Sequence, residues 1–237
     1  GAPAQELVDL VGAAAVAVLE HNGIPYELVE KEACCGMPLL EQGNLAGVAA
    51  KKEKNIPTLV RYAREGFALM AAIPSCVLMY KQELPLMFPD DADVRAVAEA
   101  FWDPFEYFGS RHKDGLLRTD FTQALGTVSY HVPCHGRVQN LGRKTYDALS
   151  LVPGTVLKVV ERCSGHAGTF GVKKEFHETA MRIGKPVFKA MSEPSPAYIA
   201  SDCQLAGHHI AQGIEEAGLP HAELAHPLTL LRKAYGI

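Results

Sequence analysis

Six cysteines are the residues of this chain whose type and spacing allow chemistry. The adjacent pair Cys34-Cys35 is followed by glycine, and the arrangement returns 129 residues later at Cys163, where serine replaces the second thiol. Cys76 returns 127 residues later as Cys203. A nearly constant offset over two separate motifs predicts an internal duplication. Thiolates that separate loops bring together hold a metal ion, an iron–sulfur cluster or a disulfide.

A disulfide framework is the least favoured of these uses. Six cysteines in 237 residues fall far below the density of a small disulfide-stabilised scaffold. Cys34 and Cys35 are adjacent, so a bond between them would close a strained ring. The N-terminus shows no basic start followed by an apolar core, so we expect no secretion signal. We expect metal binding or redox chemistry in a cytoplasmic protein, or in one peripheral to the inner face of a membrane.

The composition is that of a soluble globular protein with a sizeable core. Hydrophobic residues make up 48% of the chain and charged residues 21%. The net charge is −4, and lysines and arginines are scattered without a basic run, which argues against a nucleic-acid partner. The longest stretch without Asp, Glu, Lys, Arg or His, residues 67–80, has 14 residues and is too short to span a bilayer.

Strand-like and helix-like segments alternate along the chain. We expect strands at 26–29, 67–73, 127–132, 155–160 and 197–200. We expect helices at 6–21, 45–65 (interrupted near Pro57), 76–86, 91–111, 141–150, 173–190, 204–217 and 228–235. This succession predicts an α/β fold. With the duplication, it predicts two similar α/β modules with mainly parallel sheets, at residues 1–115 and 116–237.

Five cysteines follow a predicted strand by one to a few residues: Cys34, Cys76, Cys134, Cys163 and Cys203. The loops after parallel strands share one edge of the sheet, and ligands bind at that edge. The cysteines of one module should therefore converge although they are far apart in sequence. Helix starts after several of them offer free backbone N–H groups, which favour anionic sulfur.

The two modules are unequally complete. The second has three cysteine segments, at Cys134, Cys163 and Cys203, whereas the first has only Cys34-Cys35 and Cys76. The counterpart of Cys134 falls at residues 3–7, where no cysteine stands and no strand precedes the first helix. We expect this thiol and its strand to lie upstream of the present sequence or to have been lost.

Five ordered motifs carry a family resemblance that spans nearly the whole chain. They are Glu-Ala-Cys-Cys-Gly-Met-Pro at 32–38, Pro-Ser-Cys-Val-Leu-Met at 74–79, His-Val-Pro-Cys-His at 131–135, Glu-Arg-Cys-Ser-Gly-His at 161–166 and Ser-Asp-Cys-Gln-Leu-Ala-Gly at 201–207. These motifs resemble the cysteine-rich, or CCG, domain family. That family includes the B subunit of heterodisulfide reductase, the C subunit of anaerobic glycerol-3-phosphate dehydrogenase and the iron–sulfur subunits of glycolate and lactate oxidases.

The resemblance implies an iron–sulfur electron-transfer subunit of an oxidoreductase. Each intact module would hold a cluster, of the 4Fe-4S type or a non-standard one, and pass electrons between a flavoprotein or dithiol partner and a quinone or another carrier. The implied ligands are Cys34, Cys35 and Cys76 in the first module and Cys134, Cys163 and Cys203 in the second. A ferredoxin-like domain commonly precedes these modules, and its Cys-x-x-Cys-x-x-Cys run is not present in this chain.

Departures from the family pattern leave the fourth ligand open. The full pattern has Cys-x-x-Cys at the third segment, and here the last position holds Met79 or Ala206, while Ser164 replaces the second adjacent thiol in module two. An iron–sulfur cluster usually takes four thiolates. The upstream cysteine would complete module one. In module two the fourth ligand would be His135 or His166, unless zinc binds there as a Cys₃His site.

Three interpretations remain after these observations. The leading one is the iron–sulfur electron-transfer module. The first alternative is a structural zinc-binding interaction module without redox activity. The second is a thiol–disulfide enzyme that uses the adjacent pair Cys34-Cys35. For His135 and His166, hydrogen bonding in support of a neighbouring ligand stands beside direct ligation.

Overall fold

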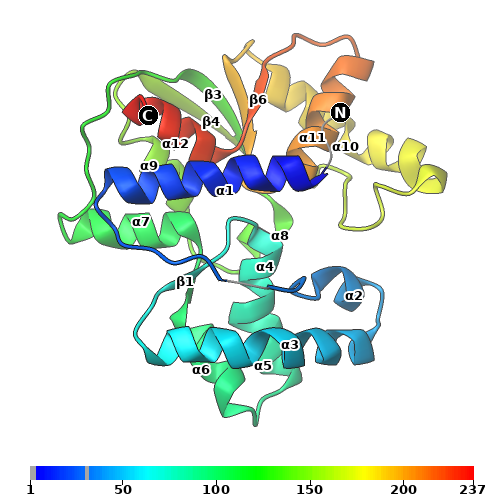
Figure 1. Cartoon of the computed structure of the whole chain (residues 1–237). Helices are drawn as coiled ribbons and strands as arrows, with labels where there is room; N and C mark the ends of the chain where they lie inside the picture. The colour runs from blue at the N-terminus through cyan, green and yellow to red at the C-terminus, as the bar shows by residue number, and fades with distance from the viewer. Residues whose placement is uncertain (1–3, 30–31) are drawn as a thin grey trace. The chain divides into compact units, whose positions relative to one another are not determined.

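The computed structural model of the chain describes residues 4–29 and 32–237. It divides into two compact units (Figure 1). The larger unit consists of Gly1–Tyr26 together with Phe105–Ile237, and the smaller unit is Glu27–Pro104.

The larger unit contains a parallel sheet of four strands in the order β4-β3-β5-β6. These strands are β3 (Gly126–His131), β4 (Thr155–Val160), β5 (Tyr198–Ser201) and β6 (Glu223–Ala225). His131 at the end of β3 lies opposite both Val160 and Ser201. Strands β3, β4 and β5 therefore end at the same level, and the chain leaves all three from one edge of the sheet.

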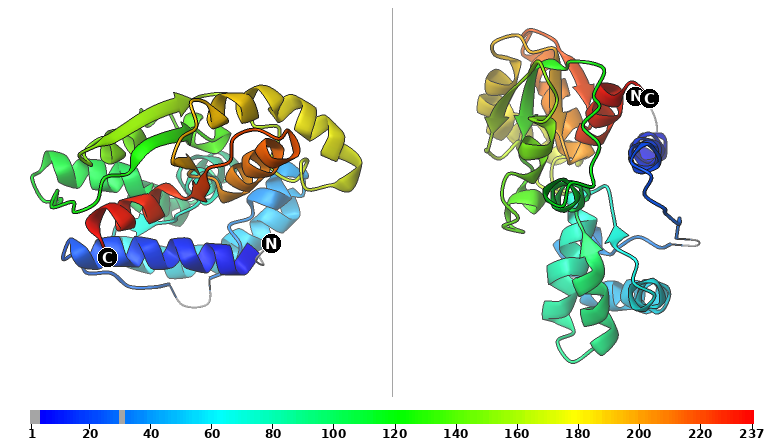
Figure 2. Two further views of the ribbon diagram at one scale, coloured as in Figure 1. Left: turned by 90° about the horizontal axis from the view of Figure 1, so that it is seen from above. Right: turned by 90° about the vertical axis from the view of Figure 1, so that its left-hand side faces the viewer.

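Helices cover both faces of this sheet (Figure 2). On one face, α9 (Lys144–Leu149) contacts β4, α12 (Pro227–Tyr235) contacts α9, and α1 (Ala4–His21) lies on α12. On the other face, α10 (His177–Ser192) contacts β3 and β4, and α11 (Gln204–Glu216) contacts β5 and β6. A core that includes Val187, Phe188, Ile199 and Ile210 fills the space between the sheet and α10 and α11. The shorter elements are α7 (Pro104–Lys113), α8 (Cys134–Arg137) and η2 (Lys174–Phe176).

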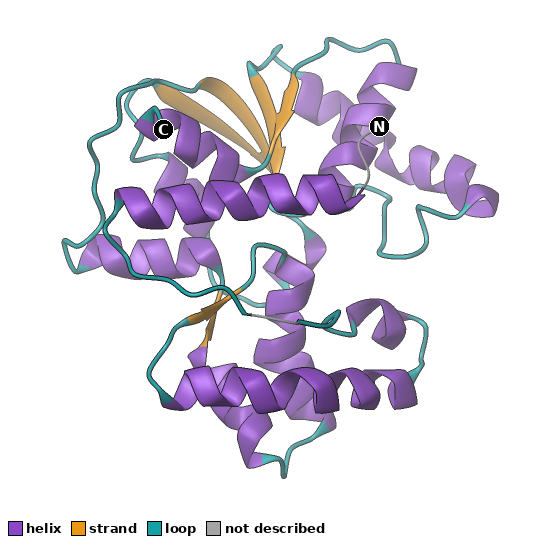
Figure 3. Ribbon diagram, viewed as in Figure 1, coloured by secondary structure: helices purple, strands orange, loops and turns teal. Residues whose placement is uncertain are grey.

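The smaller unit is mainly helical around one apolar core. Its helices are α2 (Met37–Glu41), α3 (Leu45–Arg64), α4 (Pro74–Leu78), η1 (Met79–Glu83), α5 (Leu84–Met87) and α6 (Ala92–Ala100). Two short strands, β1 (Leu69–Met70) and β2 (Phe101–Trp102), pair in parallel (Figure 3). Elements α4, η1 and α5 follow each other without a break, and η1 is a π-helical turn. This wider turn ends two residues before Pro85, which has no N–H to donate.

The α/β fold class with mainly parallel strands is confirmed. The predicted helices at 6–21, 204–217 and 228–235 correspond to α1, α11 and α12, and the predicted strands at 127–132, 155–160 and 197–200 correspond to β3, β4 and β5. Among the helices that the structure describes, none combines the length and the apolar character that a membrane-spanning segment needs.

Several expected elements were wrong in detail. Residues 26–29 form no strand, and only Leu69–Met70 of the segment 67–73 is strand. The predicted interruption near Pro57 is absent, because α3 runs through this proline and packs Ile56, Leu59 and Val60 into the core. The single helix expected at 91–111 is divided into α6 and α7 by β2, which pairs with β1. Strand β6 was not predicted.

The compact units do not follow the predicted module boundary at residue 115. Helix α1 belongs to the larger unit, because Val11, Ala14 and Val18 are buried and the helix packs on α12. The modules 1–115 and 116–237 therefore remain a prediction about the internal duplication. They do not coincide with the two compact units. The position predicted for the missing thiol, residues 3–7, begins outside the described residues and continues into α1.

Candidate metal and redox centres

Three cysteines of the larger unit lie at the carboxyl edge of its sheet. Cys134 begins α8 after β3, Cys163 lies three residues after β4, and Cys203 is the N-cap of α11 after β5. The chain passes from β3 to β4 and then returns past β3 to β5, so the strand order reverses between β3 and β5. Ligands bind at such a topological switch point in parallel α/β sheets. Cys134 and Cys203 flank it.

The protein supplies hydrogen-bond donors to these three sulfur atoms. Burial raises the pKa of Cys203, while the backbone N–H groups of Leu205 and Ala206 at the start of α11 act in the opposite direction. Cys134 and Cys163 are exposed. Arg137 Nη2 donates to Cys134 Sγ at 3.6 Å, and Gly165 N donates to Cys163 Sγ at 3.4 Å. Such donors stabilise the thiolate forms that bind metals.

A buried histidine joins two of the cysteine loops. His131, only 1% exposed, places Nε2 2.9 Å from the carbonyl oxygen of Arg162 and Nδ1 3.2 Å from Ser201 Oγ. Burial lowers the pKa of His131, so the ring is neutral, Nε2–H donates to the carbonyl and Nδ1 accepts from the serine. Ser201 Oγ in turn accepts from the Cys203 N–H at 3.4 Å. His131 therefore connects the loop before Cys163 to the loop before Cys203.

A second buried network surrounds Asp202, the residue next to Cys203. Its carboxylate accepts hydrogen bonds from the Tyr130 hydroxyl and from Thr145 Oγ1, the latter at 3.1 Å. Its carbonyl oxygen accepts from His226 Nε2 at 2.9 Å. Strands β3 and β5 are thus tied to α9 and to the start of α12 behind the cysteine edge.

The smaller unit brings its three thiols into one region. Cys34 is exposed, Cys35 is buried, and Cys76 lies half-buried in α4. A hydrogen bond from the Cys76 thiol lowers the pKa of Cys35, and the Met37 N–H and the Cys34 thiol add to this effect. The same hydrogen bond raises the pKa of Cys76, and burial adds to that rise. We assign the thiolate to Cys35 and the shared proton to Cys76, because Cys35 has the additional backbone donor.

The loop after Cys35 depends on a glycine. Gly36 has φ 97° and stands at the N-cap of α2. Residues with a side chain rarely adopt this left-handed backbone conformation. Glycine is therefore required for the chain to turn directly from the two cysteines into the helix.

The two candidate histidines have different surroundings. His135 is the second residue of α8 and is partly exposed. His166 is buried next to His209, with ring centroids 5.9 Å apart, and burial followed by the effect of His209 lowers the pKa of His166 to about 4. Within the described part of the chain, the Nε2 atoms of both His166 and His209 are buried without a hydrogen-bond partner.

The donor set fits a thiophilic centre in its chemistry and placement. Thiols with backbone N–H donors gather after the strands of the larger unit and at the start of helices in the smaller one. Among the residues that the structure describes, no group of three or more His, Cys, Asp or Glu side chains is already arranged to hold a metal ion. The structure therefore shows pairs and loops of ligands rather than a closed cage. Assignment of Cys34, Cys35, Cys76, Cys134, Cys163, Cys203, His135 and His166 as ligands remains a prediction.

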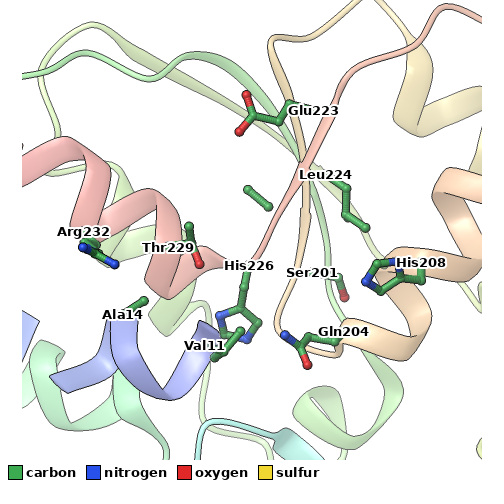
Figure 4. A pocket seen from close by; sticks show the side chains of 12 residues that line it. Val11, Ala14, Ser201, Gln204, His208, Glu223, Leu224, His226, Thr229 and Arg232 are labelled. Carbon is green, nitrogen blue, oxygen red and sulfur yellow. The ribbon is translucent and has the colours of Figure 1, made fainter. Parts of the chain in front are cut away.

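A pocket of about 300 Å³ lies in the larger unit (Figure 4). Ser201 and Gln204 line it, and these residues stand on either side of Cys203 in sequence. Val11 of α1 and Leu224 of β6 add apolar surface. Polar groups come from Thr229, Arg232, His208 and Glu223. A small molecule of mixed polarity would fit a pocket of this size and lining.

The sequence profile of the CCG cysteine-rich domain matches residues 4–81 and again residues 128–210. The chain belongs to the CCG cysteine-rich domain family. The two matches confirm the resemblance that the five cysteine motifs indicated.

Two of the relatives of this CCG protein are named as subunits of a dehydrogenase and of a reductase. It is 28% identical over 225 residues to the C subunit of anaerobic glycerol-3-phosphate dehydrogenase of Escherichia coli strain K12, covering 92% of this chain and 54% of the relative. It is 26% identical to the B subunit of the CoM/CoB fumarate reductase of Methanothermobacter marburgensis, covering 95% and 43%. It is 30% identical to lactate utilization protein A of Bacillus cytotoxicus, covering 83% and 84%. The chain thus spans about half the length of the first two relatives.

Sequence reasoning missed His131 and Asn55, the buried polar residues that hold the cysteine loops. His131 stood inside a quoted motif, three residues before Cys134, and could have been found there. Asn55 lies in the middle of α3, far from any cysteine in sequence, and gave no signal.

Proposed function

We propose that this CCG protein is the iron–sulfur electron-transfer part of an oxidoreductase. The observation that carries the proposal is the position of Cys134, Cys163 and Cys203 at one edge of a parallel sheet, with Cys134 and Cys203 flanking the switch point. The repeated cysteine block supports a second centre in the smaller unit. The electrons would pass between a flavoprotein or dithiol partner and a quinone or another carrier.

The six thiols have the chemistry that an iron–sulfur centre requires. When bound, such a cluster supplies one-electron transfer at a potential set by its ligands and by hydrogen bonds to its sulfur atoms. Cys34, Cys35 and Cys76 would hold the first centre, and Cys134, Cys163 and Cys203 the second. Backbone N–H groups of Gly165, Leu205 and Ala206 would supply hydrogen bonds to the ligand sulfur atoms.

The fourth ligand of each centre is proposed from the sequence pattern. His135 directly follows Cys134, so it is the histidine that we place at the second centre. His166 is paired with His209, so we give it a supporting role. The first centre would take a cysteine from upstream of this sequence. The cluster would be of the 4Fe-4S type or a non-standard variant of it.

The partners proposed here follow from the relatives and from the pocket. Two relatives are named as subunits of a dehydrogenase and a reductase, which supports a flavoprotein or other redox subunit as the partner. An upstream ferredoxin-like domain would relay electrons to it. The pocket lined by Ser201 and Gln204 would admit a small carrier such as a quinone. The protein would work in the cytoplasm or at the inner face of the membrane.

Zinc binding in the second module is the alternative function. Cys134, Cys163 and Cys203 with His135 form the Cys₃His donor set that structural zinc prefers. Zinc would brace the loops without carrying electrons, and the protein would act as an interaction module.

Elemental analysis of anaerobically purified protein separates these functions. We expect iron and acid-labile sulfide together, with brown colour, in the wild type. The Cys203→Ser variant should lose the iron and sulfide of the larger unit, and the Cys76→Ser variant should lose those of the smaller unit. Ser129→Ala, a buried serine on β3 outside the cysteine edge, should keep both.

Two results would contradict the iron–sulfur proposal. One is a colourless protein with stoichiometric zinc, which would establish the alternative. The other is a protein without metal or sulfide in which all six thiols titrate.

A further inference from the structure

Asn55 is a buried polar residue of α3 that contacts the loop of the two adjacent cysteines. Its side chain is only 5% exposed. Asn55 Oδ1 accepts a hydrogen bond from the Ala33 N–H at 2.9 Å. Asn55 Nδ2 donates to the carbonyl oxygens of Ala33 at 3.0 Å and Cys34 at 3.3 Å. The amide therefore bonds the backbone of this loop in both directions, as a neighbouring strand would.

The same amide reaches the helix that carries the third thiol. Asn55 Nδ2 lies 2.9 Å from the Tyr80 hydroxyl oxygen and donates to it. Tyr80 stands four residues after Cys76 in the continuous helix formed by α4 and η1. The Tyr80 ring is itself fixed by stacking on Phe101, with centroids 4.8 Å apart. One side chain thus connects the loop of Cys34 and Cys35 to the helix of Cys76.

Asparagine is suited to this position by its donors and acceptor. A neutral amide offers one acceptor oxygen and two N–H donors, which here serve three acceptors by sharing one hydrogen, and it can be buried without the cost of a charge. Aspartate would keep the bond from the Ala33 N–H but would face two carbonyl oxygens without a donor. Leucine has a similar volume and would leave the loop groups unpaired.

We propose that Asn55 is a positioning residue that sets the separation between the Cys34-Cys35 loop and Cys76. None of these four hydrogen bonds of Asn55 involves a sulfur atom. Asn55 acts through the backbone of Ala33 and Cys34 and through the Tyr80 hydroxyl. The expected effect of Asn55 on metal binding rests on the proposed function of these thiols as ligands. The expected effect of Asn55 on the alkylation of Cys35 does not depend on that function.

The first test uses the full, reduced, metal-free chain. Alkylation of Cys35 is followed against pH by mass spectrometry of the modified peptides. In the wild type, Asn55 holds the loop at the position from which the Cys35 and Cys76 side chains share a hydrogen bond. In Asn55→Leu the two thiols separate, and the midpoint should rise by about one unit or more. Asn55→Asp should also raise it, and Tyr80→Phe, which removes only one contact, should raise it less.

Asn22→Leu is the matched control. Asn22 is a buried asparagine in the larger unit, 8% exposed, which donates to the Val18 carbonyl at 2.9 Å and accepts from the Arg118 N–H at 2.8 Å. Its loss should lower stability while leaving the Cys35 midpoint unchanged. An unchanged midpoint in folded Asn55→Leu would overturn the proposal. If that variant does not fold, an unchanged midpoint in both Asn55→Asp and Tyr80→Phe would overturn it.

Cobalt binding separates this proposal from the proposed function. Co²⁺ titration, read from the visible thiolate–cobalt bands, should give an affinity about 10- to 100-fold weaker in Asn55→Leu than in the wild type. If the wild type binds neither Co²⁺ nor iron and the alkylation midpoint still shifts, the proposed function fails and the positioning role stands. If the wild type binds and Asn55→Leu binds equally well with an unshifted midpoint, the positioning role fails.

Discussion

At the scale of single residues, buried neutral histidines support the cysteine edge of the larger unit. His226 is buried, its Nε2–H donates to the Asp202 carbonyl, and its Nδ1 accepts from the Leu228 N–H at 3.1 Å. Burial lowers the pKa of His226 to about 4, and the bond to Asp202 offsets only part of this effect. The ring caps α12 and holds the residue next to Cys203 only in its neutral form.

His226 should make the protein less stable in mild acid. Its pKa is about 4 in the folded chain and 6.5 when unperturbed, so the unfolded chain binds one more proton between these values. Stability is therefore full above pH 6.5 and falls as pH drops toward 4. Between pH 7 and 5 this residue accounts for about 2 kcal/mol. His226→Asn keeps a cap for the Leu228 N–H and cannot titrate, so its unfolding free energy should fall less.

Urea unfolding at the two pH values measures this difference. His112→Asn, at an exposed histidine of α7, provides the control and should follow the wild type. An equal loss of stability in wild type and His226→Asn would show that protonation of His226 does not oppose folding.

At the scale of elements, the cysteine loops are held by side chains from a neighbouring strand. His131 at the end of β3 bonds the loop after β4 and the end of β5 together. The central strand thus controls the spacing of the loops on both sides of it. Sequence periodicity located these strands but could not show the link, because it depends on the register that places His131 opposite Val160 and Ser201.

Loss of the His131 link should loosen the Cys203 loop. In the metal-free chain, His131→Phe and Ser201→Ala should speed hydrogen exchange at the Cys203 N–H about two- to tenfold, as expected for one hydrogen bond. His131→Asn retains an acceptor for Ser201 and should restore part of the protection. Ser129→Ala on the same strand should leave exchange at Cys203 unchanged. Uniform acceleration across the whole sheet in His131→Phe would indicate general destabilisation instead.

At the scale of the whole molecule, the sequence predicted the duplication, the parallel α/β class and the positions of Cys134, Cys163 and Cys203 after strands. The same prediction was wrong for Cys34, because the strand expected before it at residues 26–29 is absent. These features depend on local patterns and on repetition, both visible in one chain. The break of the helix at 91–111 was not visible, because β2 exists only through its pairing with β1. The packing of α1 on α12 was missed because it joins segments about two hundred residues apart in sequence.

For the candidate site, the sequence predicted the cysteines but not the residues that hold their loops. Residue type identified the six thiols, and topology explains why Cys134, Cys163 and Cys203 share an edge. The residues that hold the loops, His131 and Asn55, contact backbone groups far away in sequence. Such contacts leave no spacing pattern, so the sequence does not show which backbone groups these two residues bind, although His131 lies within one of the cysteine motifs.

Electron uptake by the iron-loaded chain tests the central claim most directly. The anaerobically reconstituted protein should be titrated with a reductant while visible absorbance and electron paramagnetic resonance are recorded. We predict bleaching of the absorbance and a new paramagnetic signal, both reversed by oxidation and both lost when Cys76→Ser and Cys203→Ser are combined. Iron that takes up no electrons, or signals that survive in the double variant, would contradict the account.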